Sequence, residues 1–111
     1  KVKEEMSKLI DFYNNNKNKI YPMQSAADFH GRFEQIHPFS DGNGRVGRIL
    51  MNSILIDNNY PPIIIRKTAR QNYLKSLQDF DNNYKFNLRN FILKKFKQTF
   101  KNFFNVYIKY I

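Results

Sequence analysis

The sequence contains no cysteine and no tryptophan among its 111 residues, and only four glycines and four prolines. Without cysteine, disulfide bonds and thiolate metal sites are excluded, and the redox state of a compartment cannot be inferred. No apolar run approaches the roughly 18–20 residues that a transmembrane helix needs. The first residues, KVKEEM, are charged and polar, which is not typical of a signal peptide. We therefore expect a soluble, cytoplasmic chain with no membrane partner, and a secretion or delivery signal upstream of Lys1 stays open.

Acidic residues are also few. The chain has 9 of them against 19 lysines and arginines, a formal net charge of +10. Such a surface attracts polyanions such as nucleic acids or nucleotide phosphates. A general bias toward Lys, Asn and Ile, visible in NNNKNK at residues 14–19, would raise the charge without any such partner. The composition favours this second explanation, and a basic nucleic-acid-binding module is the lesser alternative.

Apolar residues recur at the helical period along most of the chain and are separated by short polar breaks. Pro38 stops one helix, because the residue before a proline is biased away from helical backbone. The β-branched run IIIR at residues 63–66 indicates a short extended piece. The predicted helices cover residues 2–13, 22–36, 45–57 and 69–80, with Thr68 as the N-cap of the fourth, and a fifth from about Leu88. With no repeat and no alternation of strands and helices, the sequence predicts an all-α, compact bundle of about five helices forming one domain, residues 1–111.

Two of these helices carry predicted core positions. In the fourth we expect Tyr73, Leu74 and Leu77 to point inward. In the last, aromatic and aliphatic residues fall on one face: Phe91, Ile92, Phe96, Phe100, Phe103 and Tyr107. This stripe is more typical of a core than of a binding groove. If its packing partner lies outside the chain, it would instead form an exposed interface.

The segment HPFSDGNGRVGR, His37 to Arg48, concentrates unusual chemistry between two predicted helices. A helix that starts near Gly44 presents unpaired backbone N–H groups and partial positive charge, which bind anions. Gly42 and Gly44 let a phosphate approach the backbone, and Asn43 adds an amide donor. Two arginines three residues apart can bind further phosphate oxygens, namely Arg45 and Arg48.

Two groups in this segment do not belong in a simple phosphate cradle. Asp41 would repel phosphate unless a cation lies between them, and a carboxylate beside phosphates commonly holds Mg²⁺. His37, as the free imidazole, can take a proton from a hydroxyl. A base, a metal carboxylate, an anion hole and arginines together favour phosphoryl or nucleotidyl transfer. The Walker pattern is absent.

At these residues the sequence resembles the Fic family. The family motif is H-P-F-x-[DE]-G-N-G-R-x-x-R, and His37 to Arg48 match it at every specified position. The preceding AADFHGRFEQI and the following GRILMNSILIDNNYPPIIIRKTARQNYLKSL are also similar, the latter especially to members related to the animal endoplasmic-reticulum enzyme. The similarity covers roughly residues 1–100. It implies the Fic fold core, truncated at its N-terminus.

The resemblance implies a protein adenylyltransferase that moves AMP from ATP to a Ser, Thr or Tyr hydroxyl of a target protein. Its implied site residues are His37 as general base, Asp41 as the Mg²⁺ ligand, Gly42, Asn43 and Gly44 as the anion hole, Arg45 and Arg48 as phosphate ligands, and Phe39 packed inward to fix the loop. The implied nucleoside pocket would include Tyr73 and Asp81, although related members carry Asn at the latter position.

Alternatives of donor and direction stay open, because the motif binds phosphates generically. They are another nucleotide, phosphocholine, or removal of AMP. The flap hairpin that aligns the target peptide normally precedes the first helix seen here. The inhibitory motif [ST]-x-x-x-E-[GN] does not occur in residues 1–111, so an inhibitory helix lies upstream, which the resemblance favours, or on another chain, or there is none. It also allows a homodimer. His30 lies seven residues before His37 but lacks a third ligand, so we expect a structural histidine rather than a metal ligand.

Overall fold

The computed structural model describes residues 1–110, and for residues 103, 107 and 110 it describes the backbone alone. Five α-helices and one short 3-10 helix make up this part of the chain, and it contains no strand. Their bounds are α1 Val2–Asn16, α2 Pro22–Ile36, α3 Asn43–Asp57, η1 Lys67–Ala69, α4 Arg70–Asp81 and α5 Lys85–Tyr110. The predicted all-α bundle of five helices is confirmed.

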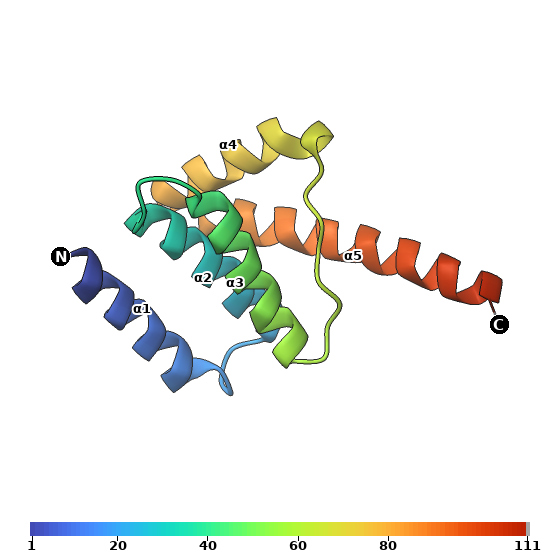
Figure 1. The fold of residues 1–111 in the computed structure, drawn as a ribbon, viewed down its shortest axis with the longest axis horizontal. Coiled ribbons are helices and arrows are strands. Elements are labelled where there is room, and N and C mark those ends of the chain that lie inside the picture. The colour runs from blue at the N-terminus through green and yellow to red at the C-terminus, as the bar shows by residue number, and fades with distance from the viewer. Residues whose placement is uncertain (111) are drawn as a thin grey trace.

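Helix α2 lies at the centre and contacts α1, α3, α4 and α5 (Figure 1). Its N-terminus carries Pro22 in the first turn, where the missing N–H removes no helical hydrogen bond. Small residues on α2 let its neighbours approach closely, and Ala26 and Ala27 are fully buried. At Gly31 an added Cβ would lie 2.8 Å from ring atoms of Phe80 on α4. The aromatic ring of α4 therefore packs directly on the backbone of α2.

One hydrophobic core joins all five helices. Its largest fully buried apolar side chains are Phe33, Phe80, Leu9, Met51, Leu55, Leu88 and Ile92. Fully burying a side chain of this size stabilises the fold by about 1.5–3 kcal/mol relative to leaving it exposed. Because α2, α3, α4 and α5 all contribute, the core fixes the ends of α2 and α3 relative to each other.

The segment between α3 and η1 is extended but pairs with no strand among the described residues. Instead, the side-chain amide of Asn52 on α3 takes the place of a neighbouring strand. Its Oδ1 accepts the N–H of Ile63 at 2.9 Å and its Nδ2 donates to the carbonyl of Ile63 at 3.1 Å. This amide holds the segment against α3, and Ile63 is buried in the core.

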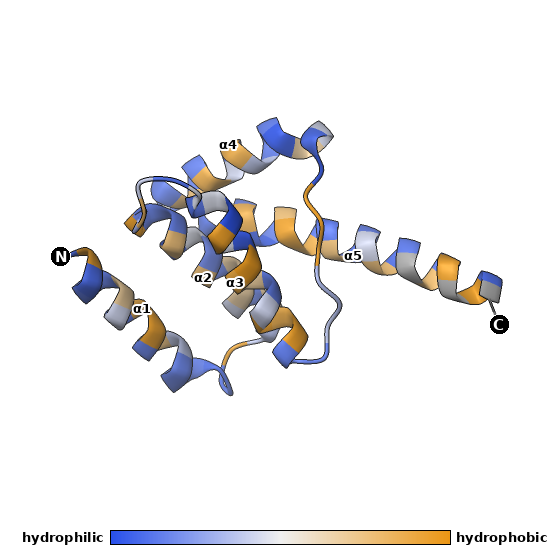
Figure 2. Ribbon diagram, in the orientation of Figure 1, coloured by the Kyte–Doolittle hydropathy of each residue, from blue (hydrophilic) through white to orange (hydrophobic). Residues whose placement is uncertain are grey.

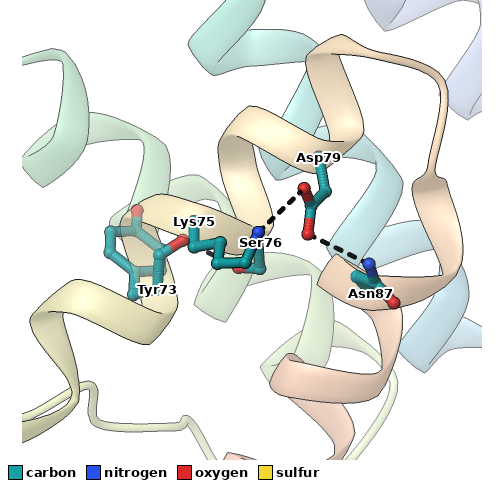
Figure 3. Close-up of polar contacts among 5 residues, drawn as sticks. All are labelled: Tyr73, Lys75, Ser76, Asp79 and Asn87. Atoms are coloured by element: carbon teal, nitrogen blue, oxygen red, sulfur yellow. Dashed lines mark hydrogen bonds and ion pairs between the residues drawn. The ribbon is translucent and has the colours of Figure 1, made fainter.

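A polar corner joins α4 to α5, and Figure 3 shows its side chains. Asp79 accepts a hydrogen bond from Asn87 at 3.0 Å and forms an ion pair with Lys75 at 3.6 Å. Ser76 donates its hydroxyl to the backbone carbonyl of Tyr73 at 2.7 Å. The contacts of Asp79 fix the turn at the end of α4, and the bond from Ser76 lies within α4, at the carbonyl of Tyr73.

Three expectations about α4 and α5 were wrong. Thr68 lies inside η1 and does not cap α4, which begins at Arg70 after Ala69. Leu74 is 46% exposed, because the buried face of α4 runs instead through Tyr73, Ser76 and Phe80. Helix α5 begins at Lys85 rather than near Leu88.

The second half of α5 extends beyond the bundle (Figure 1), which gives the molecule extents of 51 × 32 × 25 Å. Ile92 is fully buried, whereas Phe100 and Phe104 are 48% and 50% exposed. Apolar residues continue into this projecting end (Figure 2). The aromatic stripe is therefore core in its first half only, and the side chains of residues 103 and 107 lie outside the described ones. None of the described helices combines the length and apolarity needed to cross a bilayer.

Candidate active site

His37 forms the C-cap of α2 and turns the chain out of the helix. Its backbone adopts the left-handed conformation, with φ 51° and ψ 61°, and its N–H bonds to the carbonyl of Phe33 at 3.0 Å. Left-handed backbone commonly ends helices, although it is uncommon for residues other than glycine. Pro38 enforces the turn from the other side. The exposed imidazole of His37 is thereby placed at the edge of the bundle.

The buried side chain of Asn43 clamps the loop that follows His37. Asn43 is the first residue of α3 and only 4% exposed. Its Oδ1 accepts the N–H of Phe39 at 2.9 Å, and its Nδ2 donates to the carbonyl of Phe39 at 2.6 Å. The same Nδ2 lies 3.1 Å from Nε2 of His37. One amide thus joins the end of α2, the loop and the start of α3.

These contacts also determine the tautomer of His37. The N–H of Phe39 can only donate, so the Asn43 atom facing it must be the oxygen, and the amide nitrogen faces His37. An amide nitrogen only donates, so Nε2 of His37 accepts and carries no proton in the neutral ring. The ring proton is then on Nδ1. In this arrangement Nε2 of the neutral ring is unprotonated, and its lone pair faces the Asn43 amide.

Two expectations about this loop change as a result. Phe39 does not pack inward: it is 49% exposed, and its ring lies tilted by 52° to that of Phe33, with ring centroids 6.4 Å apart. The loop is fixed through the backbone of Phe39 rather than through its ring. The side-chain amide of Asn43 has both hydrogens engaged within the loop, so its contribution to an anion site is its backbone N–H.

The N-terminus of α3 has the geometry that the predicted anion site requires. Gly42 is the N-cap, with φ 78°, a conformation that glycine adopts without strain. The first helical hydrogen bond runs from the N–H of Val46 to the carbonyl of Gly42 at 3.0 Å. The N–H groups of the three residues between them therefore have no partner inside the helix. They point out of the helix start together with its positive dipole end.

Asp41 stands beside this helix start with an exposed side chain. Its Oδ1 accepts the N–H of Gly42 at 2.8 Å, which orients the carboxylate. Among the described residues no cluster of three acidic, histidine or cysteine side chains could hold a metal ion. One oriented carboxylate fits Mg²⁺ that is otherwise bound by phosphate oxygens and water, the usual arrangement in nucleotide sites.

The two arginines differ in their surroundings. Arg45 is exposed, whereas Arg48 is half-buried. A Cβ added at Gly44 would lie 3.1 Å from Nη1 of Arg48, so the guanidinium group folds back over the start of α3. The guanidinium carbon also lies 6.0 Å from the centre of the Tyr73 ring. Arg48 is thus held between the anion site and α4.

His30 is a structural histidine, as expected. Its side chain is fully buried and its Nε2 lies 2.6 Å from the hydroxyl of Tyr73. Tyr73 is itself only 5% exposed. Asp81 is exposed at the end of α4, close enough to Glu34 to raise the pKa of that carboxyl. The structure thus places the Tyr73 ring beside the Arg48 guanidinium group and Asp81 in the surroundings of Glu34, and their contact with a nucleoside stays a prediction.

Sequence reasoning missed Glu34, which lies one turn before the end of α2. Burial raises the pKa of its carboxyl, while the charges of His37 and Arg48 lower it. Glu34 therefore belongs to the electrostatic environment of the site. Its spacing, four residues after His30 and three before His37, puts it on their helix face, and this is the signal that could have found it.

Comparisons with known proteins agree on one family. A profile of the Fic/DOC family matches residues 1–55. Protein adenylyltransferase Fic from Culex quinquefasciatus is 49% identical over 59 residues, which are 53% of this chain and 12% of that protein. Protein adenylyltransferase fic-1 from Caenorhabditis elegans is 36% identical over 77 residues, 68% of this chain and 15% of that protein. The chain thus spans a small part of the curated relatives it matches.

Solved structures extend this similarity over nearly the whole chain. Fic-1 from C. elegans superposes with a TM-score of 0.93 and 26% identity, covering 99% of this chain and 34% of that one. A Fic domain containing signaling protein from Bacteroides thetaiotaomicron gives a TM-score of 0.81 and 32% identity, covering 86% of this chain and 41% of that one.

Proposed function

The chain belongs to the Fic/DOC family, and from that premise we propose that it transfers AMP from ATP to a hydroxyl side chain of a target protein. One observation carries the proposal. Asn43 joins the unprotonated Nε2 of His37 to the start of α3, where backbone N–H groups have no helical partner. A proton acceptor and an anion site within one short loop suit transfer of a phosphate group to a hydroxyl.

In this reaction the target hydroxyl attacks the α-phosphorus of ATP. A bond from its oxygen to phosphorus forms as the bond to pyrophosphate breaks, and the hydroxyl proton passes to Nε2 of His37 once the hydroxyl has replaced the Asn43 amide at that nitrogen. The N–H groups of Asn43, Gly44 and Arg45 would stabilise the charge that develops on the phosphate oxygens. Arg45 and Arg48 would bind the neighbouring phosphates. When Mg²⁺ is bound at Asp41, it would neutralise phosphate charge.

The test is transfer of labelled AMP to a protein substrate in the presence of Mg²⁺. His37→Ala should abolish label transfer and keep ATP affinity, because the base is not a phosphate ligand. Asp41→Ala should weaken the dependence on Mg²⁺. Ser40→Ala changes an exposed loop residue at an unspecified position of the motif and serves as the matched control.

The same assay distinguishes ATP from the other possible donors. ATP, the other nucleoside triphosphates and a phosphocholine donor would be compared in parallel, and release of AMP from a modified target would be measured separately. Preferential transfer from another donor would replace the adenylyl assignment and keep the roles of the loop. ATP binding without any His37-dependent transfer or release would contradict the proposal.

A further inference from the structure

Two buried polar atoms lie on either side of Gly47 in α3. Among the described residues, Nδ1 of His30 and Oε1 of Glu34 are the buried side-chain atoms with no hydrogen-bond partner. Both residues stand on α2, four positions apart and therefore on one face. Leaving either group unpaired in the interior costs about 1–3 kcal/mol. Two such atoms, one able to donate and the other to accept, call for an explanation.

Gly47 brings these two atoms together. A Cβ added at this position would lie 2.6 Å from Oε1 of Glu34 and 3.1 Å from Nδ1 of His30. Both atoms therefore border the space that a side chain at position 47 would fill. The distances place the two atoms less than 6 Å apart, a gap that small rotations of the Glu34 side chain can close.

The second ring nitrogen of His30, Nε2, lies 2.6 Å from the hydroxyl of Tyr73 on α4. Burial lowers the pKa of His30 to about 4, a weak hydrogen-bonding contact with the Gly47 backbone, too distorted to satisfy Nδ1, opposes this in part, and the charge of Arg48 reinforces it. The ring is therefore neutral near pH 7 and bears one proton. If Tyr73 donates its hydroxyl hydrogen to Nε2, the proton of the ring is on Nδ1 and points toward Glu34.

Tyr73 in turn reaches Arg48. Burial raises the pKa of Tyr73 to about 12, and the nearby guanidinium group of Arg48 opposes this rise. With its hydrogen given to His30, the Tyr73 oxygen keeps its lone pairs for the guanidinium group. Arg48 also lies over the Tyr73 ring at 6.0 Å. The hydroxyl of Ser76 donates to the backbone carbonyl of Tyr73 (Figure 3).

We propose that Glu34, His30 and Tyr73 form a buried hydrogen-bonded chain that positions Arg48 over the start of α3. In this chain His30 donates from Nδ1 to Glu34, Tyr73 donates to Nε2 of His30, and Arg48 donates to the oxygen of Tyr73. The three are positioning residues that act through Arg48. The effect on ATP rests on the proposed function, whereas the hydrogen-bonded chain itself does not.

The charged groups around Glu34 fit this arrangement. His37 from the end of α2 and Arg48 from α3 lower the pKa of Glu34, and Asp81 from α4 and burial raise it. A Glu34 carboxylate therefore faces one fixed cation, Arg48, and a donor from His30. The hydrogen-bonded chain has the Glu34 carboxylate at one end and the Arg48 guanidinium group at the other. Opposite charges at the two ends strengthen the hydrogen bonds between them.

The first test is the tautomer of His30, read from proton–nitrogen correlation spectra of the imidazole rings. The sequence has only two histidines, so the signals are assigned by comparison with His37→Ala. The proposal expects a proton on Nδ1 of His30 near neutral pH. Glu34→Gln should shift this signal, and Glu4→Gln, an exposed change on α1, should not. A proton on Nε2, or no response to Glu34→Gln, would overturn the chain.

The second test is ATP affinity, measured by calorimetry without any target protein. Tyr73→Phe keeps the ring and removes the hydroxyl, and we expect about fivefold to tenfold weaker binding. The same change in an Arg48→Ala background should have no further effect, because Tyr73 acts through Arg48. Tyr60→Phe, a half-buried tyrosine packed on Phe96, is the control and should leave the affinity unchanged.

The two proposals fail in different ways. Equal losses from Tyr73→Phe with and without Arg48 would contradict the positioning role even if AMP transfer is observed. ATP binding that follows this pattern without AMP transfer would keep the positioning role and remove the adenylyl assignment. Absence of ATP binding in the unchanged protein would remove the role in phosphate binding, and the tautomer would still decide the hydrogen-bonded chain.

Discussion

Asn43 combines two functions in one buried amide: it holds the loop through the backbone of Phe39 and it orients His37. The motif predicts where the chemistry lies, because each of its residue types has a direct reason to meet a phosphate or a proton. It does not predict the clamp, since that depends on how tightly the loop folds back on α3. The motif does not predict the role of Glu34 for the same reason, because its contact with Gly47 exists only once α2 and α3 are packed.

Asn43→Asp tests the orientation of His37. The carboxylate keeps an acceptor for the N–H of Phe39 but replaces the donor facing Nε2 with an acceptor. Nε2 should then become the protonated nitrogen, and the rate of AMP transfer should fall by about 10²-fold or more. Imidazole nitrogen shifts and the turnover rate are the measurements. An unprotonated Nε2 in this variant would show that the clamp does not set the tautomer.

His30 predicts how stability depends on pH. Its pKa falls from 6.5 unfolded to about 4 folded, so between these values the unfolded chain binds more protons. Stability is then fully present above about pH 6.5 and is lost as the pH falls toward 4, by about 3 kcal/mol. Urea unfolding at a series of pH values measures the slope, and His30→Gln should flatten it.

Glu34 acts in the opposite sense. Its pKa is raised in the folded state, so the folded chain binds more protons just above 4.5 and gains stability as the pH falls through that range. Glu34→Gln should therefore steepen the acid loss due to His30. A steeper loss in His30→Gln than in the unchanged protein would contradict the His30 assignment, and a flatter loss in Glu34→Gln would contradict the Glu34 assignment.

At the scale of helices, the ion pair between α2 and α5 tests what holds the long last helix in place. Arg89 donates to both oxygens of Asp28 at 2.8 Å, in a geometry that only a guanidinium group provides. Arg89→Lys should destabilise the fold by about 1 kcal/mol. Thermal unfolding measures the effect. Lys75→Ala, which breaks the exposed pair with Asp79, should change stability by less than about 0.5 kcal/mol.

Helices were predictable where the apolar period is strong, and their ends were not. The breaks at Pro38 and in the asparagine-rich segments give α1, α2 and α3 nearly their observed bounds. Thr68 looked like an N-cap because of its residue type, yet η1 inserts one more tight turn before α4. Such a turn depends on how residues 61–66 are held by Asn52, a contact that no local pattern reveals.

For the whole molecule, the projecting end of α5 predicts a sharp boundary in sensitivity to mutation. Ile92→Ala should destabilise the fold by about 2–5 kcal/mol, because Ile92 is fully buried. Phe100→Ala, eight residues further along the same helix, should change stability by less than about 0.5 kcal/mol. Chemical denaturation of the two variants is the measurement. A comparable loss in both would mean that the projecting end is covered in solution.

The central place of α2 has a consequence for local opening of the protein. Helix α2 contacts four other helices and ends at His37, so the proposed proton acceptor is attached to the element least able to fray. Its amides should exchange with solvent only on global unfolding, whereas α1 and the end of α5 open earlier. Fluctuations at the periphery would then leave the imidazole in place, and any control of its activity would have to come through what binds beside it.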